Sequence, residues 1–286
     1  MLEIDSGHLA EQLPAIIEEL ITGSGAVILK GAFDQSLVDD ARALVHHYTA
    51  SEDDKETHFL GGSEDDLDLQ RRVWNLLDKG EVFEQMAQHP VVMRVVGEML
   101  GDEFIMGSYC ANRIMPGGPG QEPHIDYPYW DMYKQSSFPA RINSSFPMNT
   151  QATILIDSFT AETGATAFLP HSQGELVYPT AEDRARFHAN AVRMEGEPGD
   201  CVIFNGMCWH CAMPNVSTQD RTGILIEYLP KFITPLEDLV GGIREEVLDR
   251  ATPMLRQLMS LDYPYPKLFD EAAAGTLIGR DSESET

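Results

Sequence analysis

Apolar residues follow a helical spacing in the first hundred residues of the chain. They recur every three or four positions in three segments, which predicts amphipathic helices. These segments are residues 9–21, 34–45 and 91–100. A short apolar run over 26–29, directly after a glycine-rich break, predicts one buried strand. We therefore expect residues 1–102 to form a helical region that carries a short strand.

From residue 103 onward the pattern changes to short β-type runs separated by clusters of glycine, proline, asparagine and aspartate. The runs cover residues 104–115, 150–156, 165–169, 201–204, 207–213 and 222–229. Strands at this spacing are typical of a β-sandwich or a closed jelly roll. Helical spacing returns over 236–259. The expected fold is mainly β with flanking helices, around a double-stranded β-helix core, a jelly roll of the cupin type.

The domain organisation follows from these patterns. No internal repeat or low-complexity linker interrupts the chain, so we expect a single domain over residues 1–286. Within it, 1–102 is the N-terminal helical region, 103–232 the jelly-roll core, and 233–286 the C-terminal helices with an acidic tail. Hydrophobic residues make up 43% of the sequence, which is enough for a substantial core.

Acidic residues dominate the charge. The chain has 46 Asp and Glu against 20 Lys and Arg, a formal net charge of −26. This charge repels a phosphate backbone, so we expect no nucleic-acid partner. No apolar stretch approaches the ~18 residues of a membrane helix, so we expect no membrane partner either. An acidic N-terminus without a signal-peptide pattern, together with only four cysteines, favours a cytoplasmic location. Nothing in the sequence indicates the oligomeric state.

The candidate chemistry begins directly after a turn rich in glycine and proline. His124 and Asp126 are two residues apart on a predicted strand, so both side chains can face one cation. His210 lies on a later predicted strand. Two histidines and one carboxylate leave three positions open on an octahedral ion, the pattern of non-haem Fe(II) oxygenases. Zinc would favour tetrahedral closure and more nitrogen or sulfur ligands.

A basic residue follows the second histidine closely in the sequence. Arg221 comes eleven residues after His210, at the start of the next predicted strand. If residues 214–220 form the turn, Arg221 falls diagonally across from His210, with its guanidinium on the order of 10 Å from the metal. This is about the span of a five-carbon dicarboxylate, and a guanidinium can hold a carboxylate by two parallel hydrogen bonds.

Four separated motifs resemble the phytanoyl-CoA dioxygenase family, whose members are Fe(II)- and 2-oxoglutarate-dependent oxygenases. The motifs are Arg113 to Asp126, Glu162 to Ser172, Pro198 to Asp200, and His210 with Arg221. The resemblance covers roughly residues 20 to 232 in order.

The resemblance implies that His124, Asp126 and His210 hold the iron and form the catalytic centre. It implies a reaction in which O2 and 2-oxoglutarate oxidise an unactivated C–H bond of a small-molecule or natural-product substrate, with release of succinate and CO2. Hydroxylation, desaturation and cyclisation are all compatible with it. Related halogenases lack the carboxylate, so the presence of Asp126 argues against halogenation.

The resemblance also implies the cosubstrate site. Arg221 would bind the distal carboxylate of 2-oxoglutarate. Gln121 matches a position that contacts the cosubstrate or the metal site in some members, and Thr153 matches a cosubstrate-lining position. Two departures from the family affect this region. The family often has Pro-Gly-Ser-His where this chain has the four residues from Pro170 to Gln173, and Ala212 replaces a hydroxyl residue.

A long segment of 127–149 separates two of the predicted strands. It carries aromatic and basic residues, among them Tyr127, Trp130 and Arg141. Loops of this length in compact domains are usually lids or binding loops. We expect it to close over the substrate; the alternative is a surface loop that packs its own aromatic side chains.

Two other interpretations remain. A cupin-like metal-binding isomerase or ligand-binding protein would use the same three ligands but would have no need of Arg221. Cys208 and Cys211 match a Cys-x-x-Cys motif. However, positions i and i+3 of a strand face opposite ways and stand too far apart for a disulfide, so we expect no redox chemistry there.

Overall fold

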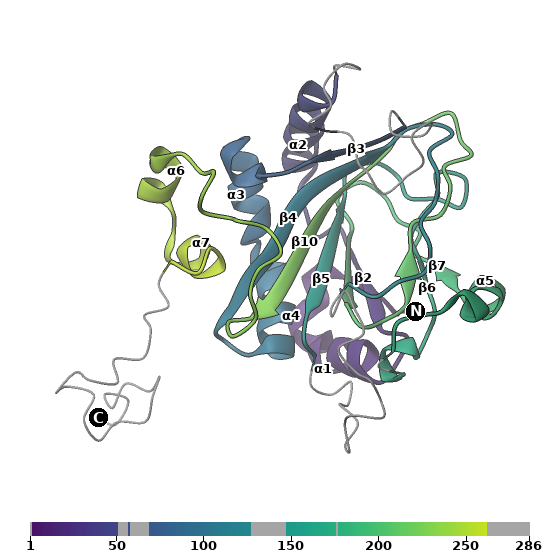
Figure 1. Ribbon diagram of the computed structural model, residues 1–286. Helices are drawn as coiled ribbons and strands as arrows, with labels where there is room; N and C mark the ends of the chain where they lie inside the picture. The colour runs from purple at the N-terminus through teal and green to yellow at the C-terminus, as the bar shows by residue number, and fades with distance from the viewer. Residues whose placement is uncertain (1, 51–56, 58–68, 127–146, 176, 262–286) are drawn as a thin grey trace, which may run out of the picture.

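The fold is built from two β-sheets and a set of flanking helices (Figure 1). The computed structural model describes residues 2–50, 57, 69–126, 147–175 and 177–261. A seven-stranded sheet has the order β1-β2-β8-β5-β10-β4-β3, and a three-stranded sheet has the order β7-β6-β9. This arrangement confirms the expected jelly-roll core with flanking helices.

The strands are short at the small sheet and longer in the middle of the large one. The large sheet contains β1 (Leu2–Asp5), β2 (Ala26–Lys30), β3 (Gln70–Val73), β4 (Phe104–Ile114), β5 (Thr150–Leu155), β8 (Cys201–Asn205) and β10 (Arg221–Pro230). The small sheet contains β6 (Ala167–Phe168), β7 (Val192–Arg193) and β9 (His210–Cys211). Neighbouring strands are antiparallel, except that β1 runs parallel to β2.

Within the described residues, helices lie before and after the central strands, and one lies in a connection between strands. They are α1 (Leu9–Ile21), α2 (Gln35–Tyr48), α3 (Glu81–Ala87), α4 (Pro90–Leu100), α5 (Arg184–Asn190), α6 (Glu245–Arg250) and α7 (Pro253–Leu258). Short 3-10 turns cover Ser6–His8, Leu76–Asp78, Ser172–Gly174 and Ala181–Asp183. The three helices expected before residue 103 are confirmed as α1, α2 and α4. Among the described residues, no helix has the length and apolar character needed to cross a membrane.

The structure corrects the expectation of a single strand before residue 103. The sheet also takes up β1 and β3, which form its two edges. An edge strand is covered on one side only and often carries polar side chains, so these segments lack the apolar pattern of a buried strand. The short helix α3 was also missed.

Two later segments are shorter than expected. The strand expected over 207–213 is confined to β9, because the residues before it form a turn. Of the helical segment expected over 236–259, only the two short helices α6 and α7 form. Gly241 and Gly242 disfavour a helix in the first part of that segment, and Pro253 begins a new helix rather than continuing the old one.

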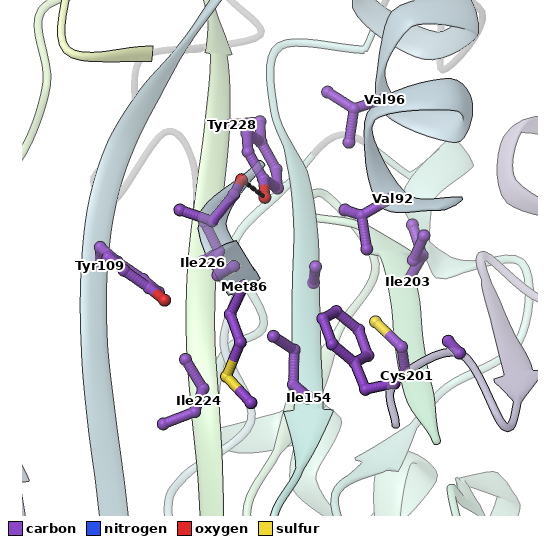
Figure 2. Packing of buried hydrophobic residues seen from close by; sticks show 14 of the residues in the cluster. Met86, Val92, Val96, Tyr109, Ile154, Cys201, Ile203, Ile224, Ile226 and Tyr228 are labelled. Atoms are coloured by element: carbon purple, nitrogen blue, oxygen red, sulfur yellow. Dashed lines mark hydrogen bonds between the residues drawn. The ribbon is translucent and has the colours of Figure 1, made fainter. Parts of the chain in front are cut away.

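Helices α1 to α4 pack against one face of the large sheet and form the main core with it (Figure 1). Figure 2 shows part of this core, in which Met86 of α3 and Val92 of α4 belong to the same cluster as Ile154 of β5. Two buried tyrosines have satisfied hydroxyls. Tyr109 donates to the carbonyl of Phe83 over 2.8 Å, and Tyr228 donates to that of Ala87 over 3.0 Å.

The other face of the large sheet is turned toward the small sheet. Alternate residues of β10 separate the two environments: Ile224, Ile226 and Tyr228 join the helix-covered core, whereas the residues between them face a cavity. A smaller apolar cluster lies on this second side and includes Phe168 of β6 and Phe204 of β8. The candidate site therefore lies between the two sheets.

Candidate active site

Two backbone segments bring the predicted metal ligands together. His124 and His210 form an antiparallel bridge, in which each backbone N–H donates to the other residue's carbonyl over 2.9 and 3.0 Å. The N–H of Asp126 donates to the carbonyl of Gly206 over 3.0 Å. The segment around His124 therefore runs beside β9 and its preceding turn, which places all three side chains on one side.

The three side chains converge on one point. His210 Nε2 lies 3.2 Å from Asp126 Oδ2, and His124 Nε2 lies 3.6 Å from Asp126 Oδ1. One ligand atom from each residue lies within 4.8 Å of the others. Adjacent ligands of an octahedral ion with bonds near 2.1 Å are about 3 Å apart, so the set fits such an ion. Among the described residues it is the only His, Cys, Asp and Glu group with this spacing.

The imidazole tautomers also fit a metal. Nδ1 of His124 lies 2.8 Å from the carbonyl oxygen of Glu122, and Nδ1 of His210 lies 2.9 Å from that of Cys208. A carbonyl oxygen can only accept, so each Nδ1 carries a proton and donates it. In the neutral ring, Nε2 then presents its lone pair toward Asp126. Metal-bound histidines are typically oriented by such a bond from the other ring nitrogen.

The charges around the three ligands favour an ionised carboxylate. Burial would raise the pKa of Asp126, but the adjacent His210 and then His124 lower it. Burial, reinforced by the charge of His210, lowers the pKa of His124. Burial also opposes protonation of His210, but the Asp126 carboxylate outweighs it and raises the pKa of His210. The site therefore combines a carboxylate with two imidazoles, the ligand set suited to non-haem Fe(II).

Arg221 enters the same cavity from the opposite sheet. Its side chain is buried, with 3% of the residue exposed, and burial lowers its pKa to about 10. It therefore stays cationic at neutral pH. The guanidinium stands 5.0 Å from the centre of the Phe159 ring and donates to the carbonyl of Gly164. No carboxylate of the described residues forms an ion pair with it, so its environment fits an anionic ligand group.

The route by which Arg221 reaches the cavity differs from the expectation. It begins β10, which pairs with β4 and β5 in the large sheet, whereas His210 lies on β9 in the small sheet. The two residues are therefore not diagonal neighbours on paired strands. They meet because the two sheets face each other across the cavity.

The two weaker cosubstrate candidates line this cavity as well. Gln121 accepts a hydrogen bond at Oε1 from the backbone N–H of Ala212 over 3.2 Å, which fixes its amide beside β9. Thr153 lies on β5, directly opposite Leu225 of β10. The structure therefore brings Gln121 and Thr153 into one cavity with Arg221 and the histidines.

The model of the phytanoyl-CoA dioxygenase family matches residues 22–223, more than two thirds of the chain. The chain belongs to the phytanoyl-CoA dioxygenase family. This result confirms the resemblance drawn from the separated sequence motifs.

Two fungal relatives of this family member are named as dioxygenases. Dioxygenase af480 of Aspergillus fumigatus is 24% identical over 193 residues, which is 67% of this chain. The match covers 59% of that relative, so this chain spans less than two thirds of its length. Dioxygenase andF of Emericella variicolor is 23% identical over 256 residues, covering 87% of this chain and 84% of the relative.

A solved structure shares the fold of this phytanoyl-CoA dioxygenase family member. The epimerase SnoN, in complex with Fe3+, alpha ketoglutarate and nogalamycin RO, superimposes with a TM-score of 0.62 at 17% identity. The similarity covers 82% of this chain and 91% of SnoN. It independently supports the jelly-roll architecture.

The expected lid lies outside the described residues. Tyr127, Trp130 and Arg141 all belong to the range 127–146, so their relation to the cavity stays a prediction. Cys208 and Cys211 are free, buried thiols that pack in two different apolar clusters.

Sequence reasoning missed several residues of this family member's cavity. Arg72 lies on the edge strand β3, and Trp74 follows the end of that strand; both line the cavity. Gln151 of β5 and Glu227 of β10 line it from the middle of the large sheet. Arg72 and Trp74 were missed together with their edge strand. Glu227 left a clear signal, because it is the only charged residue between Ile224 and Leu229 of a predicted buried strand.

Proposed function

We propose that this protein is an Fe(II)- and 2-oxoglutarate-dependent oxygenase that oxidises an unactivated C–H bond of a small molecule. One observation carries the proposal. The converging ligands His124, Asp126 and His210 share one cavity with the buried Arg221, a cation that no described carboxylate neutralises. Membership of the phytanoyl-CoA dioxygenase family and the dioxygenase names of its relatives support the same reaction class.

Each residue has a definite part in this proposal. His124, Asp126 and His210 hold the ion from one side, which leaves its other side open to ligands. Arg221 binds the distal carboxylate of 2-oxoglutarate through its fork of N–H groups, and Thr153 and Gln121 shape the wall beside it. When bound, iron and 2-oxoglutarate supply the oxidising power, with consumption of O2 and release of succinate and CO2.

Apolar side chains surround the ring of His210, which is the most deeply buried of the three ligands. The His210 ring stacks on Phe168 with centroids 5.5 Å apart and contacts Phe204 at 4.8 Å. Both phenylalanines are buried in the apolar cluster between the sheets. Packing of this kind orients the imidazole of His210 and shields that side of the site from water.

The substrate proposed here is a small molecule because the cavity lies between two sheets rather than along an open face. Hydroxylation, desaturation and cyclisation differ by the pose of the substrate, and natural-product scaffolds fit this class of small-molecule substrate.

A nucleic-acid substrate is disfavoured by the net charge of −26. A cytoplasmic location belongs to the same proposal. A cupin-like isomerase or binding protein would leave the buried charge of Arg221 without a function.

Spectroscopy and product analysis test this proposal. Adding Fe(II) and 2-oxoglutarate without oxygen should give a weak visible charge-transfer band, and admitting air should release succinate slowly. His210→Ala should abolish both signals. The control His188→Ala, which changes an exposed histidine on α5, should retain them. Wild-type protein that gives neither the band nor succinate would contradict the proposal.

A further inference from the structure

Two contacts hold the guanidinium of Arg221 in the cavity. Its Nη1 donates to the carbonyl of Gly164, and its central carbon lies over the ring of Phe159, 5.0 Å from the ring centre. Phe159 lines the same cavity and is buried, with 4% of the residue exposed. An arginine side chain has several rotatable bonds and loses much freedom on being ordered. These two contacts therefore select one orientation before any ligand binds.

The hydrogen bond to Gly164 determines which edge of the guanidinium is left for a ligand. The Nε and Nη2 atoms share one edge, and their N–H groups point the same way, as the two oxygens of a carboxylate require. Among the described residues, Gly164 is the only hydrogen-bond acceptor that the Arg221 side chain has, and it uses Nη1. The edge of Nε and Nη2 therefore remains for a carboxylate.

The carbonyl that accepts this bond belongs to a tightly held turn. Gly164 has a φ of +82°, and a Cβ there would lie 2.2 Å from the carbonyl oxygen of Met213, so only glycine fits. The turn before it is closed by two threonines. The N–H of Thr160 donates to Oγ1 of Thr163 over 2.8 Å, and the N–H of Thr163 donates to Oγ1 of Thr160 over 3.1 Å.

The ring of Phe159 is fixed from both of its sides. Its backbone forms an antiparallel bridge with Gly196, with hydrogen bonds of 2.9 and 3.0 Å. Its ring reaches Gly223, which follows Arg221 by two residues on β10 and lines the same cavity. A Cβ at Gly223 would lie only 3.1 Å from Cζ of Phe159 and 3.2 Å from Cγ2 of Thr153. The missing side chain at Gly223 therefore leaves room for the ring beside the guanidinium.

The ring of Phe159 can strengthen binding of an anion in two ways. The face of an aromatic ring attracts a cation, so it favours the orientation in which the guanidinium lies over it. An apolar ring also keeps water away from that part of the guanidinium, which strengthens its attraction for a carboxylate. Phe159 belongs to the same apolar cluster as Phe168 and Phe204, which pack around His210. One cluster thus supports both the arginine and a metal ligand.

We propose that Phe159 is a positioning residue: it holds the Arg221 guanidinium with its Nε and Nη2 edge free and so makes the site selective for a 2-oxo acid with a second carboxylate. This inference rests on the proposed oxygenase function, because it explains how Arg221 would choose the cosubstrate. It assigns Phe159 no part in holding the metal ion.

Binding of two 2-oxo acids tests the proposal. The full chain is loaded with Fe(II) without oxygen and titrated by calorimetry with 2-oxoglutarate and with 2-oxobutyrate, which lacks the distal carboxylate. The wild-type protein should prefer 2-oxoglutarate. Phe159→Leu removes the ring, so it should weaken 2-oxoglutarate about three- to thirtyfold, the range of a cation–π contact, and change 2-oxobutyrate little.

Two further variants separate positioning from general packing. Phe159→Met fills more of the space than leucine but has no ring, so it should show the same selective loss even if Phe159→Leu folds poorly. Phe187→Leu is the matched control, because Phe187 is a buried phenylalanine of α5 that belongs to another apolar cluster and does not line the cavity. It should leave both affinities unchanged. All three variants should bind Fe(II) as tightly as the wild-type protein.

Each outcome has a defined meaning. An equal loss for both oxo acids in the Phe159 variants would show that the ring only packs the cavity wall, and unchanged affinities would also overturn the inference. Wild-type protein without a preference for 2-oxoglutarate overturns it without any substitution. Failure of the oxygenase proposal is seen separately, because the wild-type protein would then give no charge-transfer band with Fe(II) and 2-oxoglutarate. A normal band together with an unchanged preference in the Phe159 variants contradicts only the role of Phe159.

Discussion

Gly206 packs directly against Asn149, so that a Cβ atom at Gly206 would overlap the side-chain amide of Asn149. Both residues hold parts of the cavity. The carbonyl of Gly206 accepts the backbone N–H of Asp126 over 3.0 Å, and Asn149 donates to Glu227 over 3.2 Å. This contact therefore links the backbone that supports the candidate metal ligand Asp126 to Glu227 in the wall of the cavity.

Gly206→Ala should damage the metal site without changing any ligand. The new methyl group must displace Asn149 or the backbone that supports Asp126, and overpacking of this kind costs about 1–3 kcal/mol. We expect a lower free energy of unfolding and weaker Fe(II) binding, measured by denaturation and by anaerobic titration. Gly174→Ala is the control because nothing lies within 4 Å of a Cβ at Gly174. Equal metal affinity in the two variants would show that the Gly206 contact has no such role.

Asp126→Ala should abolish tight metal binding. The variant leaves two imidazoles without the only carboxylate of the group, and even changes to residues behind metal ligands cost about 10–100-fold in affinity. We expect a loss of more than about a hundredfold, measured by titration with Co(II) and its visible spectrum. The control is Asp40→Ala, which removes an exposed carboxylate from α2. Retention of Co(II) affinity in Asp126→Ala would remove this residue from the ligand set.

Arg221→Lys should weaken binding of 2-oxoglutarate selectively. Lysine keeps the charge but loses the two parallel N–H groups that match a carboxylate, so we expect the KM for 2-oxoglutarate to rise about tenfold or more. Binding of 2-oxobutyrate, which lacks the distal carboxylate, should change little. Arg94→Lys, an exposed site on α4, serves as the control. If both oxo acids lose affinity equally, Arg221 does not bind the distal carboxylate.

Glu237 should make stability depend on pH. Burial raises the pKa of Glu237 despite hydrogen bonds from the backbone N–H groups of Tyr109 (2.8 Å) and Asn75 (2.9 Å). The folded protein therefore binds more protons than the unfolded chain at pH values between the unfolded pKa and the raised folded pKa. The contribution of Glu237 to stability is fully present below the unfolded pKa and falls as the pH rises through this window.

Denaturation of wild-type protein and Glu237→Gln across this pH range measures the effect. Glutamine cannot ionise and accepts at only one oxygen, so the variant should be less stable at low pH, and the difference should narrow as the pH rises. Glu246→Gln, on the exposed side of α6, should show no such trend. A difference for Glu237→Gln that stays constant with pH would contradict the raised pKa.

Several parts of the fold and site could be predicted because their signals are local. Helices α1, α2 and α4 follow from apolar spacing within each segment, and the strand pattern indicates the jelly roll. The pairing of His124 with Asp126 needs only the two-residue period of an extended chain. His210 and Arg221 were candidates because each lies on a later predicted strand, and the family resemblance supported both; the structure places them in one cavity.

The sequence by itself thus determined the types of the main elements and the chemistry of the ligands, because the period of a helix or strand involves only neighbouring residues. The tertiary structure decided which strands face each other. It put β1 and β3 at the sheet edges, brought Arg221 from the large sheet opposite His210, and turned Glu227 into the same cavity. These relationships depend on pairing between residues far apart in the chain, and no local pattern specifies that pairing.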